Sequence, residues 1–320
     1  MAIVSSLSLC ARITLDLHSL NNEGTEGNQQ QTRMVHIIDQ SGRRAIVNAI
    51  SGDMFKHILV GHLVPLLEAA GQPLSDPARR LDPDRITADE NFLKKAKEYK
   101  GKNSELLSHL LRDCSLTDLA GALFVDAALP RKSCVEFGWV VGLPTTADGE
   151  PVTATEQYFH VKYAAERGKA AGGETTVGSQ PIFHRPASSG IYAMICNLEV
   201  YRIGLNDITR QPVVDGPGRR LRAKALIESL AATILKPAGA QRNTQNPHIL
   251  NCEGVIAVSA TSLPAPTVSP LNDGYREEME KAAAVLNEIH PSSVGVTRFA
   301  SLSEGIKLLA DLARSLELPN

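Results

Sequence analysis

The chain has 320 residues, which is enough for one large domain with insertions or for two smaller domains. Hydrophobic residues make up 43% of the sequence and exclude global disorder. Aromatic residues make up only 4%, so any binding surface must rely mainly on hydrogen bonds and charge. The formal net charge of −2 argues against a nucleic-acid binder that works alone through bulk charge.

The charges are unevenly distributed along the chain. Residues 160–224 hold ten Lys and Arg against five Asp and Glu, whereas residues 271–320 hold five against eight. Such a chain could bind phosphates on one side and pack against copies of itself on another. Ordinary surface scatter explains the same counts equally well.

No sequence motif indicates a metal, a cofactor or a membrane. The five cysteines are odd in number and far apart, so they predict free buried thiols rather than disulfides or a zinc site. No Walker A loop, dinucleotide fingerprint, zinc-protease motif or nucleophile elbow is present. The sequence has no apolar run of about 18 residues and no basic stretch before residue 10, so we expect a cytoplasmic protein.

The first third of the chain predicts strands followed by one long helix. Residues 6–18 alternate apolar and polar side chains, which predicts a strand with one buried and one polar face. Residues 21–31 (NNEGTEGNQQQ) predict a long polar loop, and 33–39 and 44–48 predict short strands. A helix should follow Ser51 as N-cap and run to about residue 70, with Pro65 bending or splitting it.

The middle of the chain predicts two insertions. Residues 72–126 are charged and predict a helical lobe in two or three pieces, near 91–100, 104–113 and 115–124. Residues 134–143 return to a strand pattern. Residues 144–186 are rich in turn signals and predict a long protruding hairpin or arm.

The rest of the chain alternates strands with helices. Strands are predicted at 190–203, 249–260 and 295–299, and helices at 218–235, 275–289 and 302–316. Without the insertions, the order becomes strand, helix, strand, strand, helix, strand, the ferredoxin-like order of RRM domains. We therefore divide the chain into a core (1–71, 127–143 and 189–320), a helical insertion (72–126) and an arm (144–188).

Two segments near the N-terminus have the chemistry of a nucleic-acid contact. The amides and glycines of 21–31 can follow a sugar-phosphate backbone, although a solvated connector would have the same composition. The helix start at Ser51 and Gly52 is a natural anion site, within reach of Lys56 and His57. A capped helix with a solvated lysine is the alternative.

Two further segments lie in the second half. The first turns of a helix hold Arg219, Arg220, Arg222 and Lys224, where cations oppose the helix dipole. They suggest an external anion, such as phosphate or an acidic neighbour, or else a solubilising face. Residues 178–190 (GSQPIFHRPASSG) combine an apolar tip, cations and small residues, as a wedge beside a nucleic-acid strand would. A plain hairpin base would explain the Gly and Pro but not the His-Arg pair.

Three stretches resemble the DevR family of CRISPR-associated proteins, the backbone subunits of type I Cascade complexes, in content, order and separation. They are RITLDLHSLNNEGTEGN (12–28), VNAISGDMFKH (47–57) and IFHRPASSGIYAMICNLEVYRIG (182–204). The resemblance spans most of the chain and is weakest over 72–126 and 144–176.

The resemblance implies an α+β fold, with a modified RRM (ferredoxin-like) core, an inserted helical lobe and a protruding thumb hairpin. Several copies would stack into a helical filament along one guide RNA (crRNA), each thumb reaching over the neighbouring copy's RNA segment and displacing a base at regular intervals. Contacts would be largely to the RNA backbone, and target DNA would be recognised through the guide. The implied partners are guide RNA, target DNA, adjacent copies and other Cascade subunits, in antiviral defence, with no cofactor and no membrane.

Carried over by position, the resemblance places RNA contacts at the helix start, in the polar segment and on the thumb. At the helix start the residues are Ser51, Gly52, Lys56 and His57. In the polar segment they are Asn21, Asn22, Asn28 and Arg33, and His18 and Asn48 lie in the same matching stretches. On the thumb they are Gln180, Phe183, His184 and Arg185. The composition argument adds Arg219 and Arg220 to this set.

Two other functions compete with a non-catalytic RNA-binding subunit. Related backbone subunits of type III complexes cut target RNA with a loop aspartate, so a metal-dependent ribonuclease could use Asp16, Glu23 or Asp39. Residues 21–31 contain no Asp, which favours a non-cutting subunit. A transcriptional autoregulator would need a DNA-reading element, and the sequence shows no convincing helix-turn-helix.

Overall fold

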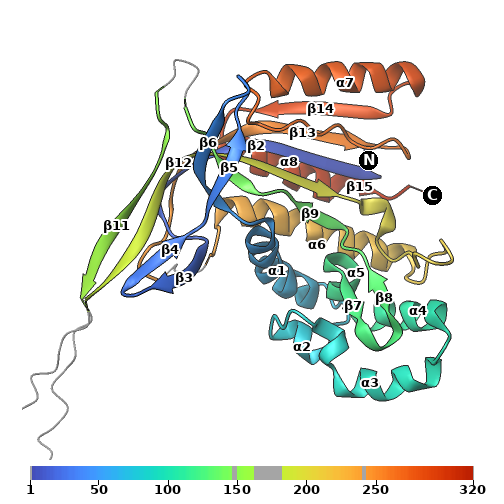
Figure 1. The fold of residues 1–320 in the computed structure, drawn as a ribbon. Helices are drawn as coiled ribbons and strands as arrows, with labels where there is room; N and C mark the ends of the chain where they lie inside the picture. The colour runs from blue at the N-terminus through green and yellow to red at the C-terminus, as the bar shows by residue number, and fades with distance from the viewer. Residues whose placement is uncertain (1, 146–149, 162–181, 240–242, 320) are drawn as a thin grey trace, which may run out of the picture.

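A large, mainly antiparallel sheet organises the chain. The computed structural model describes residues 2–145, 150–161, 182–239 and 243–319. Over these residues the sheet has 11 strands, and its main path runs β14-β13-β2-β12-β10-β6-β5 (Figure 1). The strands of this path are β2 (Ser6–His18), β5 (Met34–Ile38), β6 (Arg44–Ile50), β10 (Val140–Gly142), β12 (Ile182–Leu198), β13 (His248–Ser259) and β14 (Val294–Phe299). Together with the helices, this makes the fold α+β.

Shorter strands extend the sheet or lie apart from it. β3 (Asn22–Glu26), β4 (Gln29–Thr32), β9 (Val135–Phe137) and β11 (Thr153–Val161) join the main sheet. β1 (Ala2–Ile3) pairs with β15 (Leu316–Glu317), and β7 (Ala122–Phe124) pairs with β8 (Leu129–Arg131).

The central strand β2 has the predicted bounds, but its second face is more buried than its alternation suggests. The apolar residues from Leu7 to Leu15 face the main core, as expected. Ser8 and Cys10 on the opposite face are buried as well, because residues 260–274 and helix α7 (Tyr275–Ile289) lie over them. The sheet face that RRM domains leave open is therefore largely closed along the first half of β2.

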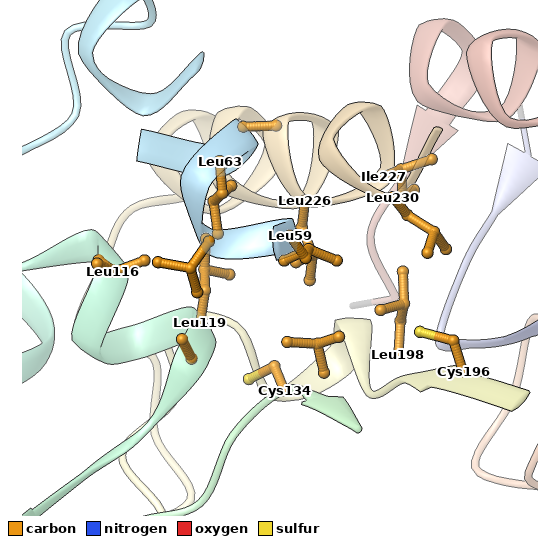
Figure 2. Packing of buried hydrophobic residues seen from close by; sticks show 14 of the residues in the cluster. Leu59, Leu63, Leu116, Leu119, Cys134, Cys196, Leu198, Leu226, Ile227 and Leu230 are labelled. Atoms are coloured by element: carbon orange, nitrogen blue, oxygen red, sulfur yellow. The ribbon is translucent and has the colours of Figure 1, made fainter. Parts of the chain in front are cut away.

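Three long helices cover the other face of the sheet. They are α1 (Gly52–Ala69), α6 (Gly216–Leu235) and α8 (Leu302–Ser315). Figure 2 shows Leu59 and Leu63 of α1 packed with Leu226 of α6, above Leu198 of β12 and Cys134. Pro65 lies inside α1, which nevertheless runs as one helix, so the predicted split does not occur. All five cysteines are free and buried, as predicted.

The insertion after α1 is a helical lobe, as predicted. It contains α2 (Asp76–Arg79), α3 (Glu90–Ala96), α4 (Asn103–Asp113), α5 (Ser115–Ala120) and short 3-10 turns. The predicted third helix ends early, because Gly121 (φ +76°) breaks it and the next three residues form strand β7.

A buried carboxylate ties this lobe to the core. Asp118 of α5 accepts from Arg131 Nη2 at 2.7 Å and from Arg222 Nη1 of α6 at 2.8 Å. It also accepts from the backbone N–H of Gly204 at 3.0 Å. None of the three charged side chains is more than 2% exposed, so this cluster is shielded from solvent.

The predicted arm is a hairpin that grows out of the central sheet (Figure 1). The first half of β12 pairs antiparallel with β11, and its second half pairs with β2 on one side and with β10 and β9 on the other. β12 therefore runs as one strand across residue 188, the predicted boundary between the arm and the core. Residues 162–181, which the sequence assigns to the same arm, lie outside the described residues.

The polar segment 21–31 is a hairpin, not the predicted loop. β3 and β4 pair antiparallel around Gly27, whose positive φ (+62°) suits a tight turn. The hairpin lies against the arm, where Gln29 of β4 pairs with His184 of β12. Its strands are fixed by this pairing and not by an apolar face, so the sequence pattern missed them.

Candidate nucleic-acid interface

The N-terminus of α1 is capped and tightly anchored. Ser51 is the N-cap, as predicted, and its Oγ accepts from the N–H of Met54 at 3.2 Å. The Ser51 N–H donates to Asn21 Oδ1 at 2.9 Å, so the buried Asn21 side chain fixes the helix start. At Gly52, a side chain would collide with the carbonyl oxygen of Phe137 at the end of β9. Ser51, Gly52 and Asn21 thus position the helix end against the sheet.

One turn into this helix, the pKa of Lys56 is affected by a cation of the helical lobe, Arg85. Lys56 is partly buried, and burial lowers its pKa, as does the positive charge of Arg85 in the helical lobe. Burial also lowers the pKa of Arg85, whose Nη1 donates to the Gly121 carbonyl while its Nε is buried without a partner. Over the described ranges, neither side chain forms an ion pair. A phosphate between them would favour the charged form of both.

Arg85 is a site residue that the sequence analysis missed. It lies in the insertion, and only the folded chain brings it to Lys56. Its positive φ (+51°) is uncommon for a non-glycine residue. His57 is exposed on the next position of α1, as a contact residue would be.

Three of the predicted contact residues have buried side chains. Asn48 is 1% exposed, and its amide donates to Thr32 Oγ1 and the Arg33 carbonyl while accepting from the Tyr192 hydroxyl. His18 is 2% exposed and lies edge-on to Tyr192, and burial lowers its pKa to about 4. The side chains of Asn48, His18 and Asn21 are thus buried in this structure, and direct RNA contact by them stays a prediction.

Asn22 is partly buried at the start of β3. Its Oδ1 accepts from Ser19 Oγ at 2.9 Å, and its Nδ2 is buried without a partner. Ser19 Oγ also reaches the Pro186 carbonyl of β12 at 3.1 Å. Asn22 thus helps to join the β3–β4 hairpin to the base of the arm.

Arg33 lies between β4 and β5 with its guanidinium at the surface. It forms an ion pair with Glu23 of β3 and lies 5.0 Å from the ring centre of Trp139. Trp139 is 47% exposed and did not figure among the predicted residues. A lone tryptophan after Gly138, inside a predicted strand, was the available signal.

The arm carries aromatic and cationic side chains on both of its faces. Phe183 lies under the Arg185 guanidinium, 4.7 Å away, and stacks on His160 at 5.8 Å between ring centres. On the other face, His184 lies 4.4 Å from Phe159, which is 74% exposed. Phe159 and His160 are further residues that the sequence analysis missed.

From the sequence we predict a long hairpin or arm over residues 144–186 but assign no strand to 153–161, which contain these two residues. The run TATEQYFHV, rich in Thr and aromatic residues, was a strand signal inside that segment. Gln180, the remaining predicted arm residue, lies outside the described residues.

The β3–β4 hairpin connects these groups into one surface. The Asn28 carbonyl accepts from the His184 N–H at 2.8 Å, and the Asn28 amide reaches the Ile182 carbonyl at 3.4 Å. At the opposite end of β4, Arg33 lies next to Trp139. A continuous path therefore runs from the start of α1 along this hairpin to the arm.

The cations at the start of α6 all have partners within the chain, so RNA contact by Arg219 and Arg220 stays a prediction. Arg219 donates to the carbonyls of Ile203 at 2.7 Å and Tyr201 at 3.0 Å, and Arg220 pairs with Glu317. Arg222 is buried against Asp118, and Lys224 lies 3.7 Å from Glu228. The Asp215 side chain caps the helix by accepting from the Gly218 N–H at 2.8 Å.

The acidic residues considered for metal-dependent catalysis have separate surroundings. Asp39 accepts from Ser41 and Arg43 in the turn after β5, which lowers its pKa. Glu23 pairs with Arg33, and Asp16 lies on β2 opposite His248. Within the described part of the chain, no group of three His, Cys, Asp or Glu residues is arranged to hold a metal ion.

Comparison with known proteins gives one family and a shared fold. The family model "CRISPR-associated negative auto-regulator DevR/Csa2" matches residues 9–280. A solved structure titled "CRISPR RNA-guided surveillance complex, pre-nicking" aligns with a TM-score of 0.53 at 12% identity, covering 96% of this chain and 100% of that chain. Another, titled "CRISPR RNA-guided surveillance complex", aligns with a TM-score of 0.48 at 12% identity, covering 97% and 99%.

Curated proteins provide no match to this sequence. None of the helices in the described ranges has both the length and the apolar run needed to cross a membrane.

Proposed function

Because the chain belongs to the DevR/Csa2 family of CRISPR-associated proteins, we propose that it is a non-catalytic backbone subunit that holds guide RNA. Copies of it bind side by side along one crRNA, contact the RNA backbone without regard to sequence, and present the bases for pairing with target DNA. It acts within an RNA-guided surveillance complex, in antiviral defence.

The strand order supports a modified RRM core. In the predicted strand-helix-strand-strand-helix-strand unit, the strands correspond to β2, β9–β10, β12 and β13. They lie side by side as fourth, first, third and second, all antiparallel, with α1 and α6 on one face. This is the ferredoxin-like arrangement.

Because one face of the sheet is covered, the RNA binds at a different place from the one typical of RRM domains. RRM domains stack bases on aromatic residues of the sheet. Here residues 260–274 and α7 cover that face near Cys10, and no aromatic residue lies on β2. The RNA instead follows the edge formed by the start of α1, the β3–β4 hairpin and the arm.

The observation that carries this proposal is the position of Lys56 one turn into α1, near enough to Arg85 for the charge of Arg85 to lower its pKa, at one end of this path. Cations and helix N–H groups attract phosphate without reading bases. Arg33 and Arg185 add two more cations further along. Few charges take part, in keeping with the near-neutral chain.

Assembly supplies the rest of the affinity. A single copy offers only a few phosphate contacts, so adjacent copies on one RNA strengthen binding by raising the local concentration of binding sites. The arm leaves Phe159 and Tyr158 exposed, which suits contact with the next copy or its RNA segment. Head-to-tail contacts of this kind generate helical arrays.

Removing one cation from each end of the path tests the proposal. The double variant Lys56→Ala, Arg185→Ala should weaken binding to single-stranded RNA and lower the salt dependence, by roughly 0.7 in the slope of log K against log salt for each lost contact. Filter binding at several salt concentrations measures both quantities. Unchanged affinity and unchanged slope would refute the site.

The matched control is Lys95→Ala, Lys281→Ala, which removes the same charge from two exposed lysines on α3 and α7. It should bind RNA as the wild type does. The non-catalytic part is tested with guide-loaded protein, complementary RNA and magnesium. Regularly spaced cleavage products would contradict it.

A further inference from the structure

Trp139 is the single tryptophan of the chain, and it is half exposed. Tryptophan is usually well buried, since its large ring contributes strongly to a core. In a chain with 4% aromatic residues, exposure of this ring leaves a large apolar surface in water. Such exposure is typical of a binding surface.

A β-bulge directs this side chain outward. Phe137 pairs with Cys196 and Val141 pairs with Ala193, so four steps along β9–β10 face three steps along β12. The extra residue falls at Gly138 and Trp139, between the two short strands. Bulges bend a strand and re-aim side chains, and they occur often beside functional sites.

The indole carries a fixed cation over its ring. The Arg33 guanidinium lies 5.0 Å from the ring centre. The Arg33 carbonyl accepts from the Ala49 N–H at 3.0 Å and from Asn48 Nδ2 at 3.0 Å, and its side chain pairs with Glu23. Backbone and side chain are both held, so the pair is pre-organised.

The bulge also touches the start of α1. Gly52 lies so close to the Phe137 and Gly138 carbonyls that it has no room for a side chain. The negative charge of Glu136, the middle residue of β9, acts to raise the pKa of Lys56, against the effects of burial and of Arg85. Trp139 therefore follows directly after a backbone contact with the start of α1, the helix that carries Lys56 one turn further on.

We propose that Trp139 and Arg33 form a stacking site for one base of the guide RNA, an inference that rests on the proposed function. An aromatic ring with a guanidinium beside it binds the flat face of any base and reads no base edge. That property suits a subunit that must accept every guide sequence. The Arg33 guanidinium at the indole favours a nucleobase, which has a π-face and polar edges, over an apolar side chain of another copy.

The emission of Trp139 gives a direct test, because no other tryptophan contributes. Protein freed of RNA is titrated with single-stranded oligouridylate and oligoadenylate, and emission is followed beside filter binding of the same samples. Both oligonucleotides should quench the emission to saturation. The midpoint of the quenching curve should equal the midpoint of the filter-binding curve. Trp139→Ala should weaken binding about tenfold, whereas Trp139→Phe should stay within about threefold of the wild type.

The control variant is Ile289→Ala, at an exposed apolar residue of α7, which should bind as the wild type does. If RNA binds with no change in emission, or Trp139→Ala binds normally, the stacking site is refuted while the proposed function stands. If no RNA binds by either measurement, both are refuted. If emission changes with protein concentration in the absence of RNA, the indole contacts another copy and the inference is wrong.

Discussion

His18 lies at the end of β2, just before the β3–β4 hairpin, and its side chain is buried. Its pKa is lowered to about 4 because burial disfavours the charged ring, whereas an unfolded histidine titrates near pH 6.5. Between these values the unfolded chain binds more protons than the folded chain. Stability from His18 is therefore fully present above about pH 6.5 and is lost as the pH falls.

This difference predicts that the free energy of unfolding drops by about 2 kcal/mol between about pH 7 and about pH 5 through His18 alone. Urea denaturation at several pH values measures it. The variant His18→Gln should show a shallower pH dependence, since the carboxylates common to both proteins contribute equally. Parallel curves for the two proteins would contradict the buried neutral form.

At the scale of single elements, two glycines of α1 have opposite surroundings. A side chain on Gly52 would meet the Phe137 and Gly138 carbonyls, whereas a side chain on Gly61 would meet nothing within 4 Å. The same substitution should therefore act in opposite directions in one helix. Gly52→Ala should destabilise the protein by roughly 1–3 kcal/mol, and Gly61→Ala should stabilise it by about 0.5–1 kcal/mol.

Thermal or urea unfolding of the two variants compares them directly, with each serving as the control for the other. Gly52→Ala should also weaken RNA binding, because the helix end would shift away from β9. A stable Gly52→Ala variant would mean that the helix start is less tightly packed than the contacts indicate.

Elements with a buried stripe could be predicted from the sequence, and elements held by pairing could not. The alternation over 6–18 and the helical spacing over 275–289 match β2 and α7 in bounds. β3 and β4 carry no regular apolar face, and they are held by pairing with each other and with the distant strand β12. A periodicity argument has no access to such pairing.

The residues of the candidate site also divide into those that local sequence predicts and those that only the tertiary structure reveals. The capped helix start at Ser51 follows from local chemistry, so the sequence indicated it. Arg85 and Trp139 enter the site only through tertiary contacts with Lys56 and Arg33. Asn48 is the opposite case: the sequence suggested a contact residue, but its polar side chain belongs to a buried hydrogen-bond network.

At the scale of the whole molecule, Asp118 joins the helical lobe to the core. Its carboxylate forms ion pairs with two buried guanidiniums, those of Arg131 and Arg222. Removing the negative charge would leave these two positive charges unpaired and shielded from water. Asp118→Asn should therefore destabilise the protein by about 3–5 kcal/mol.

Chemical denaturation measures this loss, and the exposed pair of Asp311 and Arg314 gives the control. Asp311→Asn should change stability by less than about 0.5 kcal/mol, as is usual for surface ion pairs. Because Arg85 belongs to the same lobe, Asp118→Asn should also weaken RNA binding. Equal effects of the two variants would show that Asp118 does not hold the lobe in place.

The continuity of β12 constrains how the arm can change length in evolution. Along this strand of 17 residues, neighbouring side chains point to opposite faces, so Phe183 and His184 lie on different sides of the arm. An insertion of one residue in each strand would exchange those sides, whereas an insertion of two would keep them and move the outer contacts by about 7 Å. Among relatives that share this arm, insertions and deletions in its paired strands should therefore occur in twos.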